Sequence, residues 1–163
     1  MPYLIDGHNL IPKLGLRLDS IDDEMELIAI LQEFCRLEHT PRGHVEVFFD
    51  GAPAAQAGTR KLGAVTAHFV RLGTTADDAI RNRLKMLRKS ARNWTVVSSD
   101  RQVQAEARAA FAEVVSSDSF AALLKQARDS APKPTSDRKL SQKEVEDWLK
   151  LFEERGHNKK YGG

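Results

Sequence analysis

Aspartates in this sequence recur where short apolar runs end, and their positions suggest metal chemistry. Asp6, Asp50 and Asp100 each follow such a run, while Asp77 and Asp78 open a stretch with helical spacing. Short apolar runs are typical of buried strands, so an aspartate after one lies at the carboxyl end of a strand. In an open parallel sheet those ends meet at one edge, where ligands bind. We therefore expect carboxylates from four separate segments to gather at a single edge of a sheet.

A gathering of carboxylates is unfavourable by itself, because each negative charge raises the pKa of the others. Hard divalent cations such as Mg²⁺ and Mn²⁺ prefer oxygen ligands, and Mg²⁺ takes one or two carboxylates while it keeps several waters. The sequence therefore predicts a Mg²⁺ or Mn²⁺ site at this edge. Each aspartate also has a purely structural interpretation as a turn residue, a helix cap or a first-turn acid. Their convergence on one edge favours the metal site.

The segments between these aspartates alternate between strand-like and helix-like patterns. Apolar runs predict strands at 3–5, 45–49, 65–70, 94–97 and 114–115, and helical spacing predicts helices at 22–38, 75–91, 102–112 and 119–128. Residues 52–63 have a loop-like composition. Strands separated by helices require parallel crossovers, so the expected fold class is α/β, with a mainly parallel central sheet flanked by helices.

A segment with two prolines, 131–138, is interpreted as a linker between a domain of residues 1–130 and a tail of residues 131–163. In the tail, Ser141 is expected to cap a helix whose apolar face consists of Val145, Trp148, Leu149 and Phe152. We favour packing of this face on its own domain over packing on a partner molecule. The linker and the basic end of the chain still leave room for contact with RNA or a ribosome.

Composition excludes several classes of protein. The chain has 163 residues, 41% of them hydrophobic and 29% charged, which fits a folded globular protein rather than a disordered one. It has no signal-peptide pattern and no apolar run long enough to cross a membrane. The single cysteine, Cys35, excludes an internal disulfide and a cysteine-based zinc site. We expect a cytoplasmic protein with a buried structural thiol.

Four motifs resemble the YacP-like branch of the NYN family, within the PIN-like nucleases. They are Leu4-Ile5-Asp6-Gly7-His8-Asn9-Leu10, Phe48-Phe49-Asp50-Gly51, Thr75-Ala76-Asp77-Asp78 and Val97-Ser98-Ser99-Asp100-Arg101. The resemblance covers residues 3 to about 128 in order and spacing, and residues 140–152 resemble the tail of that branch. The DGHN and TADD elements are specific in combination, whereas either alone is weak.

The resemblance implies an RNA endonuclease with a PIN-like three-layer fold and an acidic metal site. By motif position, the metal ligands would be Asp6, Asp77 and Asp100. Asn9 would join them in the catalytic set by holding a metal-bound water or a phosphate, while Asp50 and Asp78 would bind the metal or position its ligands. Some bacterial members are similar to ribosome-associated enzymes that cut messenger RNA. Messenger RNA is therefore the expected substrate, and the ribosome a candidate partner.

Charge is unevenly distributed, although the formal net charge is only +2. Residues 19–26 carry five acids and no base, whereas residues 81–92 carry six bases and no acid. This asymmetry suits a surface that binds a polyanion, and a solvated helix flank explains it equally well. Helical geometry predicts an exposed row of bases beginning beside Asp78. The candidate RNA-binding residues are Arg60, Lys61, Arg81, Lys85, Arg88 and Arg92.

Some of these residues, and the fold itself, also fit other roles and other protein classes. His8 is a candidate general base, but its place after an Asp-Gly pair favours a turn or RNA-contact role. Ser98 and Ser99 are expected to hydrogen-bond a carboxylate or a phosphate rather than act as nucleophiles. A haloacid-dehalogenase-type phosphatase would have an aspartate at position 8, where this chain has His8. A receiver domain would need an acidic pair before the end of the first strand and a lysine after a late strand, and neither is evident. The alternative function is a non-catalytic RNA-binding module on the same fold.

Overall fold

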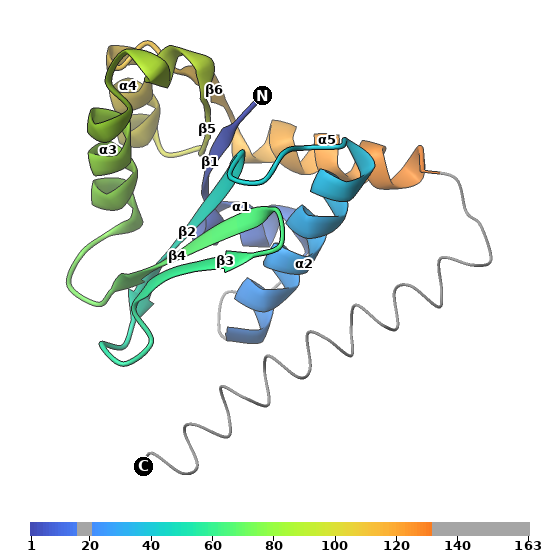
Figure 1. Cartoon of the computed structure of the whole chain (residues 1–163), viewed down its shortest axis with the longest axis horizontal. Helices are drawn as coiled ribbons and strands as arrows, with labels where there is room; N and C mark the ends of the chain where they lie inside the picture. Colours follow the sequence, from blue (N-terminus) through green and yellow to red (C-terminus); the bar gives the residue numbers. More distant parts are fainter. Residues whose placement is uncertain (16–20, 132–163) are drawn as a thin grey trace. The chain divides into compact units, whose positions relative to one another are not determined.

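The structure is a computed structural model that describes residues 1–15 and 21–131 (Figure 1). Residues Met1–Ser130 form one compact unit. The helix expected from Ser141 onward, with its apolar face, lies outside the described residues, as does nearly all of the expected linker. No helix in the described part of the chain is long and apolar enough to span a membrane.

Six strands form one sheet in the order β3-β4-β2-β1-β5-β6. The strands are β1 (Tyr3–Asp6), β2 (Val45–Ala52), β3 (Gly58–Leu62), β4 (Val65–Arg71), β5 (Thr95–Val97) and β6 (Glu113–Val115). All neighbouring pairs are parallel except β3 and β4, which are antiparallel. Tyr3 pairs with both Val45 and Thr95, so β2, β1 and β5 run in register toward the same edge. The predicted α/β fold with a mainly parallel sheet is confirmed.

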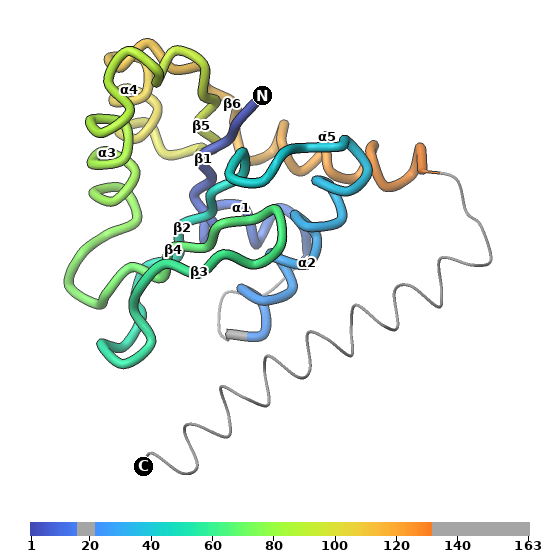
Figure 2. Tube along the Cα trace, in the orientation of Figure 1, coloured from blue at the N-terminus to red at the C-terminus, as the bar shows by residue number. Residues whose placement is uncertain are grey.

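Helices cover both faces of this sheet, giving three layers (Figures 1 and 2). On one face α3 (Ala76–Leu87) packs on β1 and β2, and α4 (Arg101–Ala109) packs beside it on β6. On the other face lie α1 (Gly7–Leu10), α2 (Ile21–Leu37) and α5 (Ser117–Asp129). The short 3-10 helices η1 (Ile11–Leu14) and η2 (Arg88–Asn93) follow α1 and α3.

Strand β3 corrects the expectation that residues 52–63 form a loop. It pairs antiparallel with β4, beginning opposite Phe69 and ending opposite Val65. None of its five residues is buried, so the alternation of apolar and polar residues that marks a half-buried strand is missing. Polar and basic residues are common on edge strands because they discourage pairing with other chains. Apolar patterns in the sequence therefore do not predict this strand.

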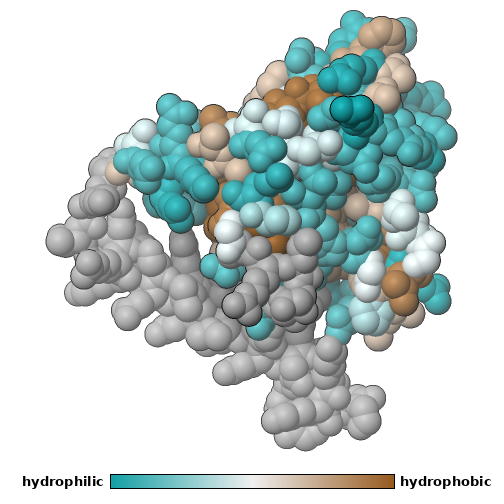
Figure 3. Space-filling model, turned by 180° about the vertical axis from the view of Figure 1, so that it is seen from behind, coloured by the Kyte–Doolittle hydropathy of each residue, from teal (hydrophilic) through white to brown (hydrophobic). Residues whose placement is uncertain are grey.

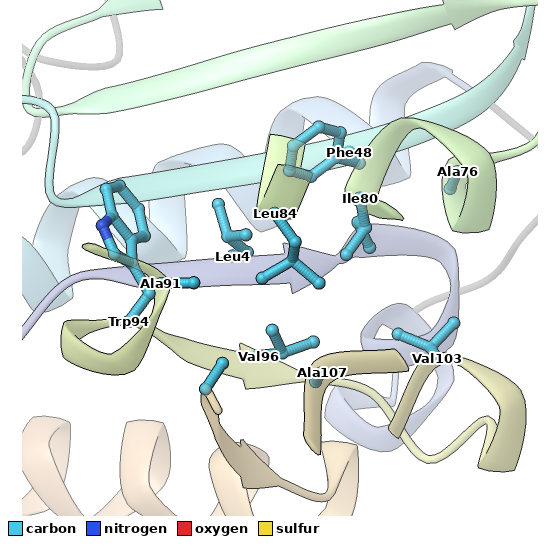
Figure 4. Close-up of a cluster of buried hydrophobic side chains, with 11 residues drawn as sticks. Leu4, Phe48, Ala76, Ile80, Leu84, Ala91, Trp94, Val96, Val103 and Ala107 are labelled. Carbon is cyan, nitrogen blue, oxygen red and sulfur yellow. The ribbon is translucent and has the colours of Figure 1, made fainter. Parts of the chain in front are cut away.

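The core between the sheet and α3 contains most of the predicted apolar stripe (Figure 4). Ile80 and Leu84 of α3 are buried here against Trp94, which follows η2, and against residues of the strands and of α4: Leu4, Phe48, Val96, Val103 and Ala107. Ala91 is also buried, but it belongs to η2. The helix expected to reach residue 91 ends at Leu87, because Arg88 adopts a φ of 51° and breaks the α-helical path.

The opposite face of the sheet is closed by α2 and α5. Tyr3 of β1 packs against Phe34 and Phe120, with ring centroids 6.2 and 5.1 Å away. Cys35 is buried on α2, and burial raises the pKa of its thiol to about 11, which confirms the expected buried thiol. Hydrophilic side chains dominate the face of the molecule seen in Figure 3, with only small apolar areas between them.

Candidate active site

Asp6 is the last residue of β1 and the most deeply buried carboxylate among the candidate residues, with 7% of its surface exposed. Its pKa is raised to about 6, mainly by burial and also by the negative charges of Asp77 and Asp50. The Ser98 hydroxyl, 3.3 Å from Asp6 Oδ2, donates a hydrogen bond that opposes this rise, as does the backbone of Asn9. Asp6 is therefore a charged group held in an environment that disfavours its charge.

Asp77 lies in the first turn of α3, where it faces the other acids. The pKa of its carboxyl is raised, first by burial and then by the negative charges around it, which belong to Asp100, Glu106, Asp50 and Asp78. These electrostatic interactions connect carboxylates from the end of β2, the start of α3 and the start of α4. Asp6 and Asp77 thus interact electrostatically with each other and with the other three predicted acids at this edge of the sheet, Asp50, Asp78 and Asp100.

Asp100 combines a structural role with this position. Its Oδ1 accepts hydrogen bonds from the backbone N–H groups of Gln102 at 2.8 Å and Val103 at 3.3 Å, so it caps α4. Its own backbone N–H donates to the Ser98 hydroxyl oxygen at 3.1 Å. Because Ser98 also donates to Asp6, one fully buried serine fixes the spacing of two predicted metal ligands.

His8 lies between two carboxylates, an arrangement that sequence patterns did not reveal. Its Nδ1 is 2.8 Å from Asp50 Oδ1, and its Nε2 is 2.6 Å from Glu24 Oε2. Hydrogen bonding to Glu24 is the largest cause of a raised His8 pKa, and Asp50 acts in the same direction, while burial opposes both. Only a doubly protonated imidazolium can donate to both carboxylates at once. Such a cation has no lone pair to accept a proton, so this geometry disfavours the general-base role.

Glu24 is the residue of this site that the sequence argument missed. It lies in the first turn of α2, where acids are explained by the positive end of the helix dipole. No spacing relates it to His8, since 16 residues separate the two. Its position in an acidic run at 19–26 was the only available signal, and that signal does not distinguish Glu24 from its neighbours.

Asn9 ties three segments together. Its side-chain oxygen accepts a hydrogen bond from the Ser99 backbone N–H at 2.8 Å and another from the Ser117 hydroxyl at 2.5 Å. These contacts join α1 to the β5–α4 connection and to the start of α5. The side-chain oxygen is thus used within the protein, which leaves the amide nitrogen of Asn9 for the predicted contact with a water or a phosphate.

Arg81 does not belong to an open row of bases, contrary to expectation. Its Nη1 lies 3.1 Å from Asp78 Oδ1, and its Nε lies 2.6 Å from Glu106 Oε1. The two acids partly neutralise this guanidinium and hold it against α4. The other bases predicted on this helix side, Lys85, Arg88 and Arg92, are exposed. The expectation of exposed bases therefore agrees with these three residues and is wrong at Arg81. The three do not form one helical row, because the α-helical path breaks at Arg88.

Arg60 and Lys61 lie apart from these bases, on the edge strand β3. The Arg60 guanidinium lies 5.5 Å from the centre of the Phe69 ring, whereas Lys61 is exposed. Neighbouring residues of a strand point to opposite faces of the sheet, so these two side chains cannot contribute to one surface. The structure does not join them to the bases of α3.

The chemistry of the acidic edge fits a divalent cation, although its side chains do not form a complete ligand cage. Among the described residues, no three His, Cys, Asp or Glu side chains approach closely enough to hold a metal ion. Mg²⁺ is usually bound through one or two carboxylates, with waters completing its octahedron. The carboxylates of Asp6 and Asp77, whose negative charges repel each other, are oxygen donors of this kind. The donor set therefore fits Mg²⁺ or Mn²⁺ better than a metal that needs a cage built by protein alone.

Comparison with known proteins agrees with this fold. The chain matches the family model of the YacP-like NYN domain over residues 3–155. It is similar to the crystal structure of Rae1 (YacP) from Bacillus subtilis, with a TM-score of 0.64, 22% sequence identity and coverage of 94% of this chain and 89% of that one. The W164L mutant of the same protein gives a TM-score of 0.58 at 19% identity, with the same coverage. No match was found among curated proteins.

The family model covers nearly the whole chain, including all four motifs at the acidic edge. The family is one of PIN-like nuclease domains, and it supports an RNA-related nuclease function in general terms. The solved structures, at this level of identity, support the fold alone. This chain belongs to the YacP-like NYN domain family.

Proposed function

We propose that this protein is a divalent-metal-dependent endoribonuclease that hydrolyses RNA phosphodiester bonds at its acidic edge. The observation that carries the proposal is the environment of Asp6, which is 7% exposed and has a pKa raised to about 6. A carboxylate with a purely structural role is not expected at a position where burial and the charges of Asp77 and Asp50 disfavour its ionised form. Perturbed carboxylates of this kind are concentrated at functional sites.

Asp6, Asp77 and Asp100 are the residues that would hold Mg²⁺ or Mn²⁺, with Asp50 and Asp78 beside them. Because no three of these side chains surround one point, waters would join at least one of them to the cation. When bound, the cation would activate a water and neutralise negative charge on the scissile phosphate and the leaving oxygen. The negatively charged carboxylates would attract the cation, and the bound cation would relieve their mutual repulsion. Asp6 and Asp77 then remain ionised at neutral pH, since a nearby positive charge lowers the pKa of each.

The neighbouring groups position these carboxylates. Ser98 fixes Asp6 relative to Asp100, while His8 holds Asp50 in one orientation through a bond to its Oδ1. The second ring nitrogen of His8 is anchored on Glu24 of α2, so the position of Asp50 depends on a second layer of the fold. Preorganised carboxylates of this kind need not be rearranged when a cation binds.

The proposal extends to the substrate, partner and location. We propose messenger RNA as the substrate, the ribosome as a partner and the cytoplasm as the compartment. The support for these finer points is the motif resemblance together with the exposed bases on α3 and η2. The division into a nuclease domain of residues 1–130 and a tail of residues 131–163 belongs to the same proposal, with the tail left for partner contacts.

A cleavage assay on circular RNA tests the central claim. A circle has no ends, so its conversion to a linear product requires an endonuclease. The full-length chain should linearise labelled circular RNA with Mg²⁺ or Mn²⁺ and should not do so with EDTA. Asp6→Asn should slow cleavage at least about 100-fold, because such metal sites contribute several kcal/mol to transition-state stabilisation.

Asp129→Asn is the matched control. Asp129 is an exposed aspartate and the last residue of α5, about 18 Å along the helix axis from Ser117, which bonds Asn9. This variant should cleave like the unmodified chain. Metal-independent cleavage, or equal rates for Asp6→Asn and the unmodified chain, would refute the proposed mechanism. RNA binding without cleavage under any metal would instead identify a non-catalytic RNA-binding module.

A further inference from the structure

A groove of about 700 Å³ lies between α3 with η2 on one side and the end of α4 on the other. Its charged lining consists of five bases and one acid: Arg81, Lys85, Arg88, Lys89, Arg92 and Glu106. Because Glu106 is bound by Arg81, the groove has a clear surplus of positive charge. Its uncharged lining is apolar and includes Leu84 and Phe111. A basic groove with an apolar lining suits a ligand that carries both negative charges and flat apolar faces.

Phe111 ends α4 in an unusual way. The backbone N–H of Phe111 donates to Arg108 at 2.9 Å, and that of Ala112 donates to Ala107 at 2.9 Å. This pair of bonds is the Schellman motif, whose left-handed position is usually occupied by glycine. Here a phenylalanine occupies it, with a φ of 64°. A bulky residue in this conformation is strained.

Packing does not offset this strain, since 79% of Phe111 is exposed to solvent. Arg88, with a φ of 51°, is a second strained residue in the groove. Only three non-glycine residues in the described part of the chain have a positive φ, and two of them line this one groove. Strained residues held on a surface, without burial to justify them, indicate a functional role.

We propose that this groove binds single-stranded RNA, with phosphates on Lys85, Arg88 and Arg92 and one unpaired base stacked on Phe111. The inference rests on the proposed function, since it specifies the form of RNA that the nuclease accepts. Aromatic side chains bind the exposed faces of unpaired bases, whereas the bases of a duplex are covered by their neighbours. An exposed phenylalanine beside basic residues therefore selects single strands over duplexes.

The position of the groove also connects it to the acidic edge. Helix α3 begins with Asp77 and Asp78 at that edge and then forms one wall of the groove. Seven residues separate Asp78 from Lys85, a distance of about 10 Å along a helix axis. A strand bound in the groove can therefore continue along α3 to the carboxylates.

Fluorescence anisotropy with EDTA present measures this binding without cleavage. The probes are a 12-nucleotide single strand, its duplex form and a single strand of the same length with abasic positions. Phe111→Gly should weaken binding of the normal single strand by about tenfold, the loss expected from one stacked base. Its melting temperature should not fall, because glycine fits the left-handed position better. Phe111→Trp should retain affinity.

The abasic strand separates stacking from charge. The unmodified chain should bind it about tenfold more weakly than the normal strand, whereas Phe111→Gly should bind both equally. Met86→Ala is the matched control, since Met86 is an exposed apolar residue of α3 that does not line the groove. It should bind like the unmodified chain.

Full affinity of Phe111→Gly for the single strand, or equal affinity of the unmodified chain for the duplex, would overturn this inference. Both results are independent of the proposed chemistry, because cleavage is measured separately. If the unmodified chain binds single strands through Phe111 but does not cut them, the groove inference stands and the proposed nuclease function fails. If Phe111→Gly cuts RNA at the normal rate and binds it with unchanged affinity, the nuclease function stands and the groove inference fails.

Discussion

The Ser98 hydroxyl donates a hydrogen bond to Asp6 Oδ2 across 3.3 Å, and both groups are buried. The same hydroxyl oxygen accepts a bond from the Asp100 backbone N–H at 3.1 Å. A hydroxyl can donate one hydrogen while it accepts another, so a single small side chain links the end of β1 to the cap of α4. The spacing of two predicted metal ligands therefore depends on this contact.

Ser98→Ala should weaken this link in two measurable ways. Loss of a hydrogen bond to a buried charged group destabilises a fold by about 1 to 3 kcal/mol, which urea unfolding measures. The bond also lowers the Asp6 pKa, so its removal should shift the acidic limb of the cleavage profile to higher pH. Ser130→Ala, at an exposed serine after α5, should change neither quantity. An unshifted acidic limb would mean that the Ser98 hydrogen bond does not affect the ionisation of Asp6 during cleavage.

Asp6→Asn should stabilise the protein at neutral pH when divalent metal is absent. The Asp6 pKa rises from 3.8 to about 6 on folding, so the folded protein binds this proton more tightly than the unfolded chain. Ionisation therefore destabilises the fold, and stability attributable to Asp6 is lost as pH rises from about 4 to 6. The difference is about 3 kcal/mol, at about 1.4 kcal/mol per pKa unit.

Urea unfolding at pH 7.5 and pH 4, with EDTA present, measures this effect. The variant should be more stable than the unmodified chain at the higher pH, and the difference should largely vanish at the lower pH. Titrating groups that do not interact with Asp6 are shared by both proteins and cancel in the comparison. A constant difference across this range would mean that Asp6 has an ordinary pKa.

Mg²⁺ or Mn²⁺ should stabilise the unmodified chain more than Asp6→Asn. A ligand that binds only the folded state at 100 times its dissociation constant adds about 2.7 kcal/mol of stability. Removal of one carboxylate ligand should reduce this gain, because the cation loses both a donor and a charge. Thermal unfolding with increasing metal measures the difference. Equal metal-induced shifts in the two proteins would place the cation away from Asp6.

Gly7→Ala should disturb the connection between β1 and α1. A Cβ on Gly7 would overlap the Phe49 ring and lie 2.9 Å from the backbone oxygen of Phe48. Overpacking of this kind costs about 1 to 3 kcal/mol, and the shift should also move Asp6 and His8 and reduce cleavage. Gly43→Ala has open space around the new Cβ and tests backbone strain alone, at a φ of 81°. It should reduce stability without changing the cleavage rate of the folded protein.

Much of the acidic edge could be predicted because its signals are local. Asp6, Asp50 and Asp100 follow buried strands whose apolar runs are easy to recognise, and parallel pairing brings the ends of such strands together. The apolar stripe of α3 placed Asp77 toward the sheet for the same reason. Helical and strand periodicity thus determined which side chains face one another, without knowledge of any contact.

The contacts that tune the site could not be predicted, because they join residues distant in sequence. The bonds of His8 to Glu24 and of Asn9 to Ser117 depend on how α1 packs against α2 and α5. The pairing of Arg81 with Glu106 depends likewise on the approach of α3 to α4. Edge strand β3 was missed because it buries no residue. In each case the sequence lacks a periodic signal.

The bases of α3 and η2 should differ in their contribution to RNA binding according to their ion pairs. Lys85 and Arg88 are exposed and line the basic groove, so Lys85→Gln with Arg88→Gln should remove two phosphate contacts. The slope of log K against log salt should become shallower by about 1.4 units on single-stranded RNA. Arg81→Gln should change the slope far less, because Asp78 and Glu106 already neutralise Arg81. Anisotropy titrations at several salt concentrations, with EDTA present, measure both slopes. An equal change for Arg81 alone would show that RNA displaces its acidic partners, and an unchanged slope in the double variant would place RNA outside the groove.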